Sequence, residues 1–187
     1  MSALGEAISL LKRVFESHGL RWFVFGAQAV AARAAPRATQ DVDVTVEVDS
    51  ARLATVVVDL ERRGFRHRYP EIAEELLAGG AVLPLVHEGG MEVDLVVAAS
   101  GLEALALARA TMVAVDGVEV PVAHPTDLVV MKTLAGRGKD EEDLRALLAT
   151  GEVDLVEARD LLEQLERALG QSDLLPRLDA ALRDVRG

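Results

Sequence analysis

The stretch DVDVTVEV, residues 41–48, alternates strictly between acidic or polar side chains and valines. Successive side chains of a strand point to opposite faces, so this pattern predicts a β-strand with one apolar face and one acidic face. Asp41 and Asp43 leave the same face, where like charges repel unless a cation neutralises them. One interpretation is a site for a divalent metal ion, since Mg²⁺ prefers carboxylate oxygens. The other is a solvated strand face, which Glu47 and Asp49 support.

A glycine stands where the preceding strand meets a helix. The bulky apolar run at 21–25 predicts a buried strand ending at Gly26, and the alanine-rich run at 27–35 predicts a helix that Pro36 ends. Glycine lets the backbone N–H groups of a helix start come close to a phosphate. We therefore expect Gly26 to line a phosphate-binding loop.

Basic side chains follow this glycine. Arg37 and Thr39 lie between Gly26 and the Asp pair, and a guanidinium suits phosphate oxygens, so we expect both to border the same pocket. Arg33 is equally well explained as a surface residue of the helix. A second basic cluster at 62–68 would suit an RNA acceptor, but we interpret it as a solvated helix end.

A third carboxylate lies inside another apolar strand. Asp94 interrupts the apolar run at 91–98, which is costly unless the carboxylate is exposed or liganded. Glu92 shares its face, so a polar strand face is the alternative interpretation. Beside Asp41 and Asp43, Asp94 would complete three carboxylates able to hold two metal ions about 3.5–4 Å apart.

Further charged residues lie near the start of a later helix. Lys132 falls inside an apolar helix, where its ammonium either reaches water or points into a site to meet phosphate. Lys139 and Asp140 begin the next helix, and capping by Asp140 is the simplest interpretation.

The order of the elements predicts an α+β fold, with a mixed β-sheet flanked by helices and a helical C-terminal portion. We expect one domain at 1–150 and C-terminal helices at 151–187 that pack on it. Two hairpins are predicted: residues 88–90 (EGG) join the strands of one, and Asp116-Gly117 joins the strands of the other. The further strands are expected at 81–87, 91–98, 111–115 and 118–122. The further helices are expected at 4–18, 50–63 (capped by Ser50), 126–134, 140–149, 154–169 and 173–185.

Composition excludes several classes of protein. The net charge is −11 at pH 7, which argues against indiscriminate binding to nucleic-acid backbones. Cysteine is absent, which excludes disulfide scaffolds, Cys-ligated metals and thiol catalysis. No apolar stretch approaches the ~20 residues of a membrane helix, and no signal peptide is evident. We expect a cytoplasmic protein without a membrane partner.

Together these elements resemble the nucleotidyltransferase superfamily related to DNA polymerase beta, in particular its minimal branch of AbiEii-type toxins and their relatives. The resemblance covers roughly residues 20–150. It is carried by Gly26-Ala27, residues 37–43 (RATQDVD), Val93-Asp94-Leu95, Lys132 and residues 137–140 (RGKD).

The resemblance implies a role for each matching residue. It implies a nucleotidyltransferase fold, a metal triad of Asp41, Asp43 and Asp94, and Mg²⁺ (or Mn²⁺) as cofactor. The loop at Gly26-Ala27, with Arg37, Thr39, Lys132 and Arg137, would bind the nucleotide, and Lys132 and Asp140 would also be catalytic. Ala27 departs from the family's usual Ser or Gly and removes a hydroxyl that could bind phosphate.

The implied activity is transfer of a nucleoside monophosphate from a nucleoside triphosphate, with release of pyrophosphate, to an RNA 3′ end (tRNA among the candidates) or a protein hydroxyl. A toxin of this kind would have a cognate antitoxin. One alternative is a non-catalytic protein of the same fold that binds nucleotide or a partner protein. Another is an interaction module whose acidic helices dock a basic partner.

Overall fold

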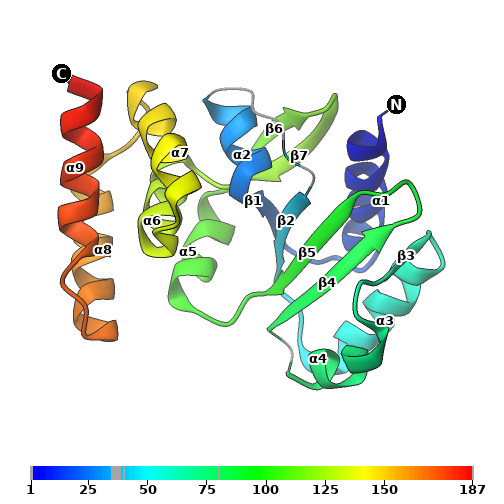
Figure 1. Ribbon diagram of the computed structural model, residues 1–187. Coiled ribbons are helices and arrows are strands. Elements are labelled where there is room, and N and C mark those ends of the chain that lie inside the picture. Colours follow the sequence, from blue (N-terminus) through cyan, green and yellow to red (C-terminus); the bar gives the residue numbers. More distant parts are fainter. Residues whose placement is uncertain (1, 35–38, 40, 80, 187) are drawn as a thin grey trace. The chain divides into compact units, whose positions relative to one another are not determined.

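A computed structural model describes residues 2–34, 39, 41–79 and 81–186 (Figure 1). Arg37, one of the predicted nucleotide-binding residues, and Pro36 lie outside the described residues. The chain divides into two compact units, one comprising residues 1–28 and 38–123 and the other residues 29–37 and 124–187. The predicted boundary at residue 150 stays a prediction.

The first unit contains a mixed seven-stranded sheet with the strand order β3-β4-β5-β2-β1-β7-β6. Two pairs, β2 with β5 and β1 with β7, are parallel, and the other neighbours are antiparallel. The strands are β1 (Trp22–Phe25), β2 (Asp41–Val46), β3 (Phe65–His67), β4 (Val82–His87), β5 (Glu92–Val97), β6 (Thr111–Val115) and β7 (Val118–Val122).

The valines of the 41–48 stretch form the apolar face that the alternation predicts. Val42, Val44 and Val46 are fully buried, whereas Asp41 and Asp43 on the other face are half-buried. The apolar face also receives α1, since Phe15 of that helix packs on Trp22 with ring centroids 5.2 Å apart. The strand ends at Val46, two residues earlier than predicted.

The predicted hairpin at 111–115 and 118–122 is confirmed at both ends. Asp116 and Gly117 join its strands with φ of 50° and 79°, the pair of positive values that a two-residue type I′ turn requires. This turn fixes the register of β6 against β7.

The first unit also contains helices. They are α1 (Ala3–Ser17), the first residues of α2 (Gly26–Arg33), α3 (Ser50–Glu61), a 3₁₀ turn η1 (Pro70–Ile72), α4 (Ala73–Gly79) and α5 (Gly101–Arg109). The predicted cap at Ser50 is wrong, because the side chain of Asp49 accepts the Arg52 N–H and Ser50 is already helical. The sequence pattern did not predict α5, which Ser100 and Glu103 begin with a reciprocal capping box.

The second unit is helical, as predicted for the C-terminal portion. Besides the end of α2 it contains α6 (Pro125–Ala135), α7 (Gly138–Ala149), α8 (Leu155–Leu169) and α9 (Leu174–Arg186). Figure 1 shows α8 and α9 side by side, in orange and red. Leu128, Leu147, Leu162 and Leu178 are fully buried and form part of its core. Within the described residues, no helix is long and apolar enough to cross a membrane.

Candidate functional site

Acidic side chains from two adjacent parallel strands share one face of the sheet. In the register of β2 and β5, Asp43 lies opposite Asp94 and Asp41 lies opposite Glu92. Residues paired in register point to the same side of a sheet, so these four carboxylates form one group, here called the carboxylate face. The tertiary structure therefore brings Asp94 alongside Asp41 and Asp43, which lie about fifty residues before it in the chain.

Gly26 lies against the carboxylate face, at the start of α2. Its φ is +66°, a conformation that L side chains rarely adopt, and a Cβ there would lie 1.8 Å from Oδ2 of Asp43. Its neighbour Phe25 pairs with Asp43 in the antiparallel register of β1 and β2. Only glycine lets the backbone turn from strand to helix this close to the carboxylate. The next residue, Ala27, is buried.

Asp94 carries an ion pair that the sequence did not predict. Arg68 donates from Nη2 to Oδ1 of Asp94 and from Nη1 to Oε2 of Glu92. Burial raises the pKa of Asp94; Arg68 opposes that rise, and the neighbouring charges of Asp41 and Glu92 add to it. Asp94 therefore lies where a cation is needed, and Arg68 supplies one.

The available sequence signal for Arg68 was the basic cluster at 62–68, which we interpreted as a solvated helix end. The structure shows that β3 begins inside that cluster, at Phe65, and that the Arg68 N–H donates to the Pro84 carbonyl at 2.9 Å. Pro84 in turn pairs in register with Asp94. Strand pairing thus places Arg68 level with Asp94 on the sheet.

The donor set of the carboxylate face fits a hard divalent cation, because it consists of carboxylate oxygens on neighbouring strands. The arrangement is not a ready-made site: in the described part of the chain, no three His, Asp or Glu side chains are grouped to hold a metal ion. Asp94 is held by Arg68, and Asp41 accepts a hydrogen bond from the hydroxyl of Thr39. The metal triad stays a prediction, and Asp94 would have to exchange partners to join it.

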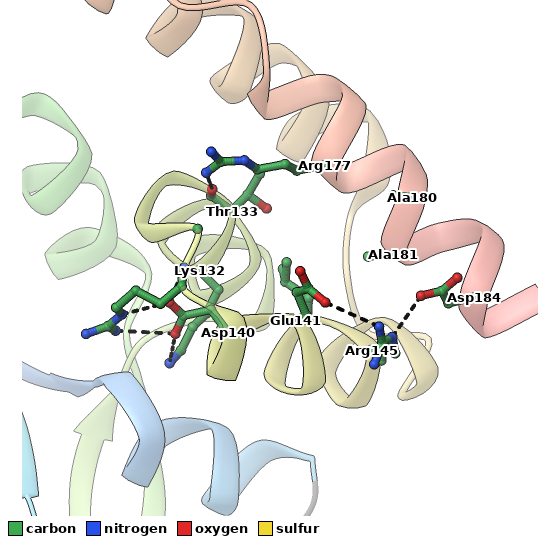
Figure 2. A pocket seen from close by; sticks show the side chains of 12 residues that line it. Lys132, Thr133, Asp140, Glu141, Arg145, Arg177, Ala180, Ala181 and Asp184 are labelled. Carbon is green, nitrogen blue, oxygen red and sulfur yellow. Dashed lines mark hydrogen bonds and ion pairs between the residues drawn. The ribbon is translucent and has the colours of Figure 1, made fainter.

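The residues predicted near Lys132 meet in the second unit. The Lys132 ammonium lies 2.9 Å from Oδ1 of Asp140 and 2.6 Å from Oδ2 of Asp143 (Figure 2 shows the pair with Asp140). The exposed fractions of these side chains are 6% for Lys132, 1% for Asp140 and 2% for Asp143. These three residues, with Arg137, are here called the Lys132 network.

Asp140 accepts hydrogen bonds from the Arg137 backbone N–H at 3.1 Å and from Nε of Arg137 at 2.8 Å. The N-cap residue of α7 is therefore Arg137, and not Asp140 as the sequence predicts. Asp140 is the third residue of the helix, and its side chain accepts the backbone N–H of the N-cap residue. Burial would raise the pKa of Asp140, but the bonds from Arg137 and Lys132 outweigh it and lower the pKa to about 2. The predicted catalytic and nucleotide-binding roles of these residues stay predictions.

Asp143 was not among the predicted site residues. Helical spacing could have predicted that Asp143 is buried, since it lies four residues before the buried Leu147 and so on the same face of α7. A carboxylate at a buried helical position implies a buried cation, and Lys132 in the apolar helix α6 was the matching signal.

A cavity of about 160 Å³ opens beside the Lys132 network, between α6, α7 and α9 (Figure 2). Two acidic residues of its lining pair with one arginine: Arg145 lies 2.9 Å from Asp184 and 3.5 Å from Glu141. Arg177 pairs with Asp173 at 2.6 Å and lies so close to Gly136 that a Cβ there would be 1.8 Å from its Nη1. The lining of the cavity is therefore charged, and its charged side chains are held in ion pairs.

Solved structures share this fold. One is the solution structure of the antibiotic-resistance factor ANT(2'')-Ia, with 16% identity, a TM-score of 0.58, and 87% of this chain and 90% of that chain covered. Another is a lincomycin-bound lincosamide antibiotic adenylyltransferase, LnuA, with 14% identity, a TM-score of 0.51, and 79% and 98% covered. A third is an antigenic nucleotidyltransferase-like protein from Paracoccidioides brasiliensis, with 18% identity, a TM-score of 0.54, and 95% and 92% covered. The fold is therefore that of nucleotidyltransferases.

Residues 2–173 match a family described as nucleotidyltransferase of unknown function (DUF6036), and the chain belongs to that family. The expected membership of the nucleotidyltransferase superfamily is confirmed, while the AbiEii-type branch stays a prediction. No protein of curated function matches the sequence.

Proposed function

We propose that the protein is a metal-dependent nucleotidyltransferase that moves a nucleoside monophosphate from a nucleoside triphosphate to an acceptor hydroxyl and releases pyrophosphate. The observation that carries this proposal is the carboxylate face, where Asp43 lies opposite Asp94 and against Gly26. Membership of a nucleotidyltransferase family supports the same reaction class.

In the proposed reaction, Asp41 and Asp43 hold Mg²⁺ (or Mn²⁺), with Asp94 as the third ligand. Bound there, the metal would neutralise phosphate charge and favour ionisation of the acceptor hydroxyl. Asp94 accepts the proton of that hydroxyl, whose oxygen forms a bond to the α-phosphorus as the bond to pyrophosphate breaks. The backbone N–H groups that begin α2 at Gly26 face the triphosphate.

For the acceptor, we propose an RNA 3′ end, a tRNA among them, or a protein hydroxyl. In its finer form the proposal is a cytoplasmic toxin related to the AbiEii type, held in check by an antitoxin. Its support is the order of the motifs in the sequence, from Gly26 to Asp140.

The test is transfer of label from each α-³²P nucleoside triphosphate, with Mg²⁺ or Mn²⁺, to total RNA, tRNA and cell protein. Tobramycin and lincomycin belong in the acceptor panel, because solved structures of the same fold hold adenylyl-2''-tobramycin (ANT(2'')-Ia) and lincomycin (LnuA). We expect Asp43→Ala to abolish labelling and Glu119→Ala, an exposed acid on β7, to retain it. Undiminished labelling by Asp43→Ala would refute the proposed site.

A non-catalytic nucleotide-binding protein is the second candidate. Two observations favour it: Arg68 holds Asp94, and Ala27 supplies no hydroxyl for a phosphate. Calorimetric titration with Mg²⁺ and each nucleoside triphosphate separates the candidates. Binding without turnover on any acceptor would favour the non-catalytic protein.

A further inference from the structure

Arg68 is the residue of the 62–68 basic cluster that reaches the carboxylate face. Its guanidinium spans Asp94 and Glu92 on β5, and its side chain is only 20% exposed. The Tyr69 ring lies with its centroid 6.0 Å from Cζ of Arg68. Arg66, two residues earlier, is exposed. Of these two arginines, Arg68 therefore places its positive charge inside the group of carboxylates.

The ion pair offsets only part of the negative charge of the carboxylate face, and it leaves the guanidinium incompletely satisfied. Nε of Arg68 is buried and has no hydrogen-bond partner among the described residues. A buried donor without a partner costs free energy. Releasing Arg68 from the carboxylates therefore loses less favourable free energy than releasing a fully hydrogen-bonded guanidinium would. The oxygens that it occupies are those that a hard divalent cation prefers.

We propose that Arg68 is the resident counter-ion of Asp94 and that a divalent cation binds the carboxylate face by exchange for this guanidinium. The inference rests on the proposed function, since it takes the metal ligands from there. The exchange explains why, among the described residues, no acidic side chains form a ready-made metal site while the guanidinium binds two of them. Arg68 is thus a positioning residue that sets the affinity of the site for metal.

The test is Mn²⁺ binding, followed by the loss of the free Mn²⁺ signal in electron paramagnetic resonance, for the full chain without nucleotide. Arg68→Gln removes the competing charge, so Mn²⁺ should bind about tenfold more tightly than to wild type. Arg68→Lys keeps the charge and should stay close to wild type. Arg66→Gln is the matched control, since it removes the same charge nearby without touching Asp94, and should change the affinity much less.

Three results would overturn the exchange. If Arg68→Gln binds Mn²⁺ no more tightly than Arg66→Gln does, Arg68 does not compete, and the proposed function survives. If Arg68→Gln binds more weakly, Arg68 supports the metal site instead. If neither wild type nor any variant binds Mn²⁺, both the exchange and the proposed metal-dependent function are refuted.

A second measurement is made on the wild-type protein and needs a variant only to assign one signal. The side-chain ¹⁵N guanidinium signal of Arg68, assigned by its loss in Arg68→Lys, should be protected from solvent exchange in the metal-free protein. Saturating Mg²⁺ should abolish that protection. A signal that stays protected while Mg²⁺ binds would also overturn the exchange.

Discussion

The carboxylate face and the Lys132 network both join acids to cations, yet they differ in charge balance and in exposure. The carboxylate face brings four acids together with Arg68, and its members remain partly exposed, with Asp94 at 32% and Glu92 at 48%. The Lys132 network joins two carboxylates to Lys132 and Arg137, and both carboxylates are almost fully buried.

This difference assigns a different role to the charged groups of each region: cation binding for the carboxylate face and stability for the Lys132 network. An acid-rich, accessible face can accept a further cation, which is what a metal-dependent enzyme needs. A balanced network whose ammonium and carboxylates are buried cannot lose one of these groups without leaving a charge unpaired in a poorly solvated place. We therefore expect substitutions in the network to change stability and those on the carboxylate face to change binding and activity.

The largest expected effect on stability is that of Lys132→Met. It leaves Asp140 and Asp143 buried near each other without their shared ammonium, which should lower the free energy of unfolding by about 3 to 5 kcal/mol. Urea denaturation followed by circular dichroism measures this. Lys139→Met, an exposed neighbour on α7, is the control and should stay within about 0.5 kcal/mol of wild type. Equal effects of the two variants would contradict the structural role.

The next largest effect on stability is expected from a substitution at Gly26, whose backbone lies against the carboxylate face. Gly26→Ala forces a side chain into a positive φ and against Asp43. Gly117→Ala has a similar φ of +79°, but no atom of the described residues lies within 4 Å of its Cβ. We expect Gly26→Ala to be the less stable of the two by about 1 to 3 kcal/mol, which is the cost of overpacking. It should also weaken Mn²⁺ binding, while Gly117→Ala leaves it unchanged. Thermal unfolding and the Mn²⁺ titration decide this.

A pH-dependent effect should come from the Lys132 network. The pKa of Asp140 in the folded chain is about 2, below its ordinary value of 3.8, so the ionised carboxylate stabilises the fold above pH 4. That stabilisation, about 2 kcal/mol, should be lost as pH falls from 4 toward 2. Urea denaturation at pH 5 and pH 2.5 should show the loss in wild type and in Asp160→Asn, an exposed control. A loss of the same size in Asp140→Asn would show that it comes from other groups.

The smallest effect on stability should come from the carboxylate face itself. Asp41→Asn keeps an oxygen that can accept the Thr39 hydroxyl and removes a charge among like charges. We expect the free energy of unfolding to change by less than about 1 kcal/mol, even though nucleotide transfer is lost. A large loss of stability would mean that Asp41 belongs to the scaffold, and would remove the contrast between the two regions.

Local patterns predicted most of the elements. The alternation at 41–48 gave β2, and Asp116-Gly117 gave the β6–β7 hairpin, because both signals lie within a few residues. The helix α5 was missed, since its capping box at Ser100 precedes a short run of alanines and leucines without clear periodicity. The cap of α3 was assigned one residue too late, because Asp49 and Ser50 are equally good capping residues.

The candidate site was predicted only in part, for a different reason. Asp41, Asp43 and Asp94 could be chosen because acids on apolar strands stand out in a sequence. Their partners could not, because an arginine in a basic cluster looks the same whether it faces water or Asp94. Arg68 became visible only through the pairing of β3 with β4 and of β4 with β5.

The sequence by itself determined which strand faces are apolar, where the turns lie and which carboxylates share a strand, because these properties depend on side-chain period and on residues a few positions apart. Only the tertiary structure decided which charges meet. It set Asp94 beside Asp43, Arg68 on Asp94, and Asp143 on Lys132, because strand register and helix packing join residues that no local pattern connects.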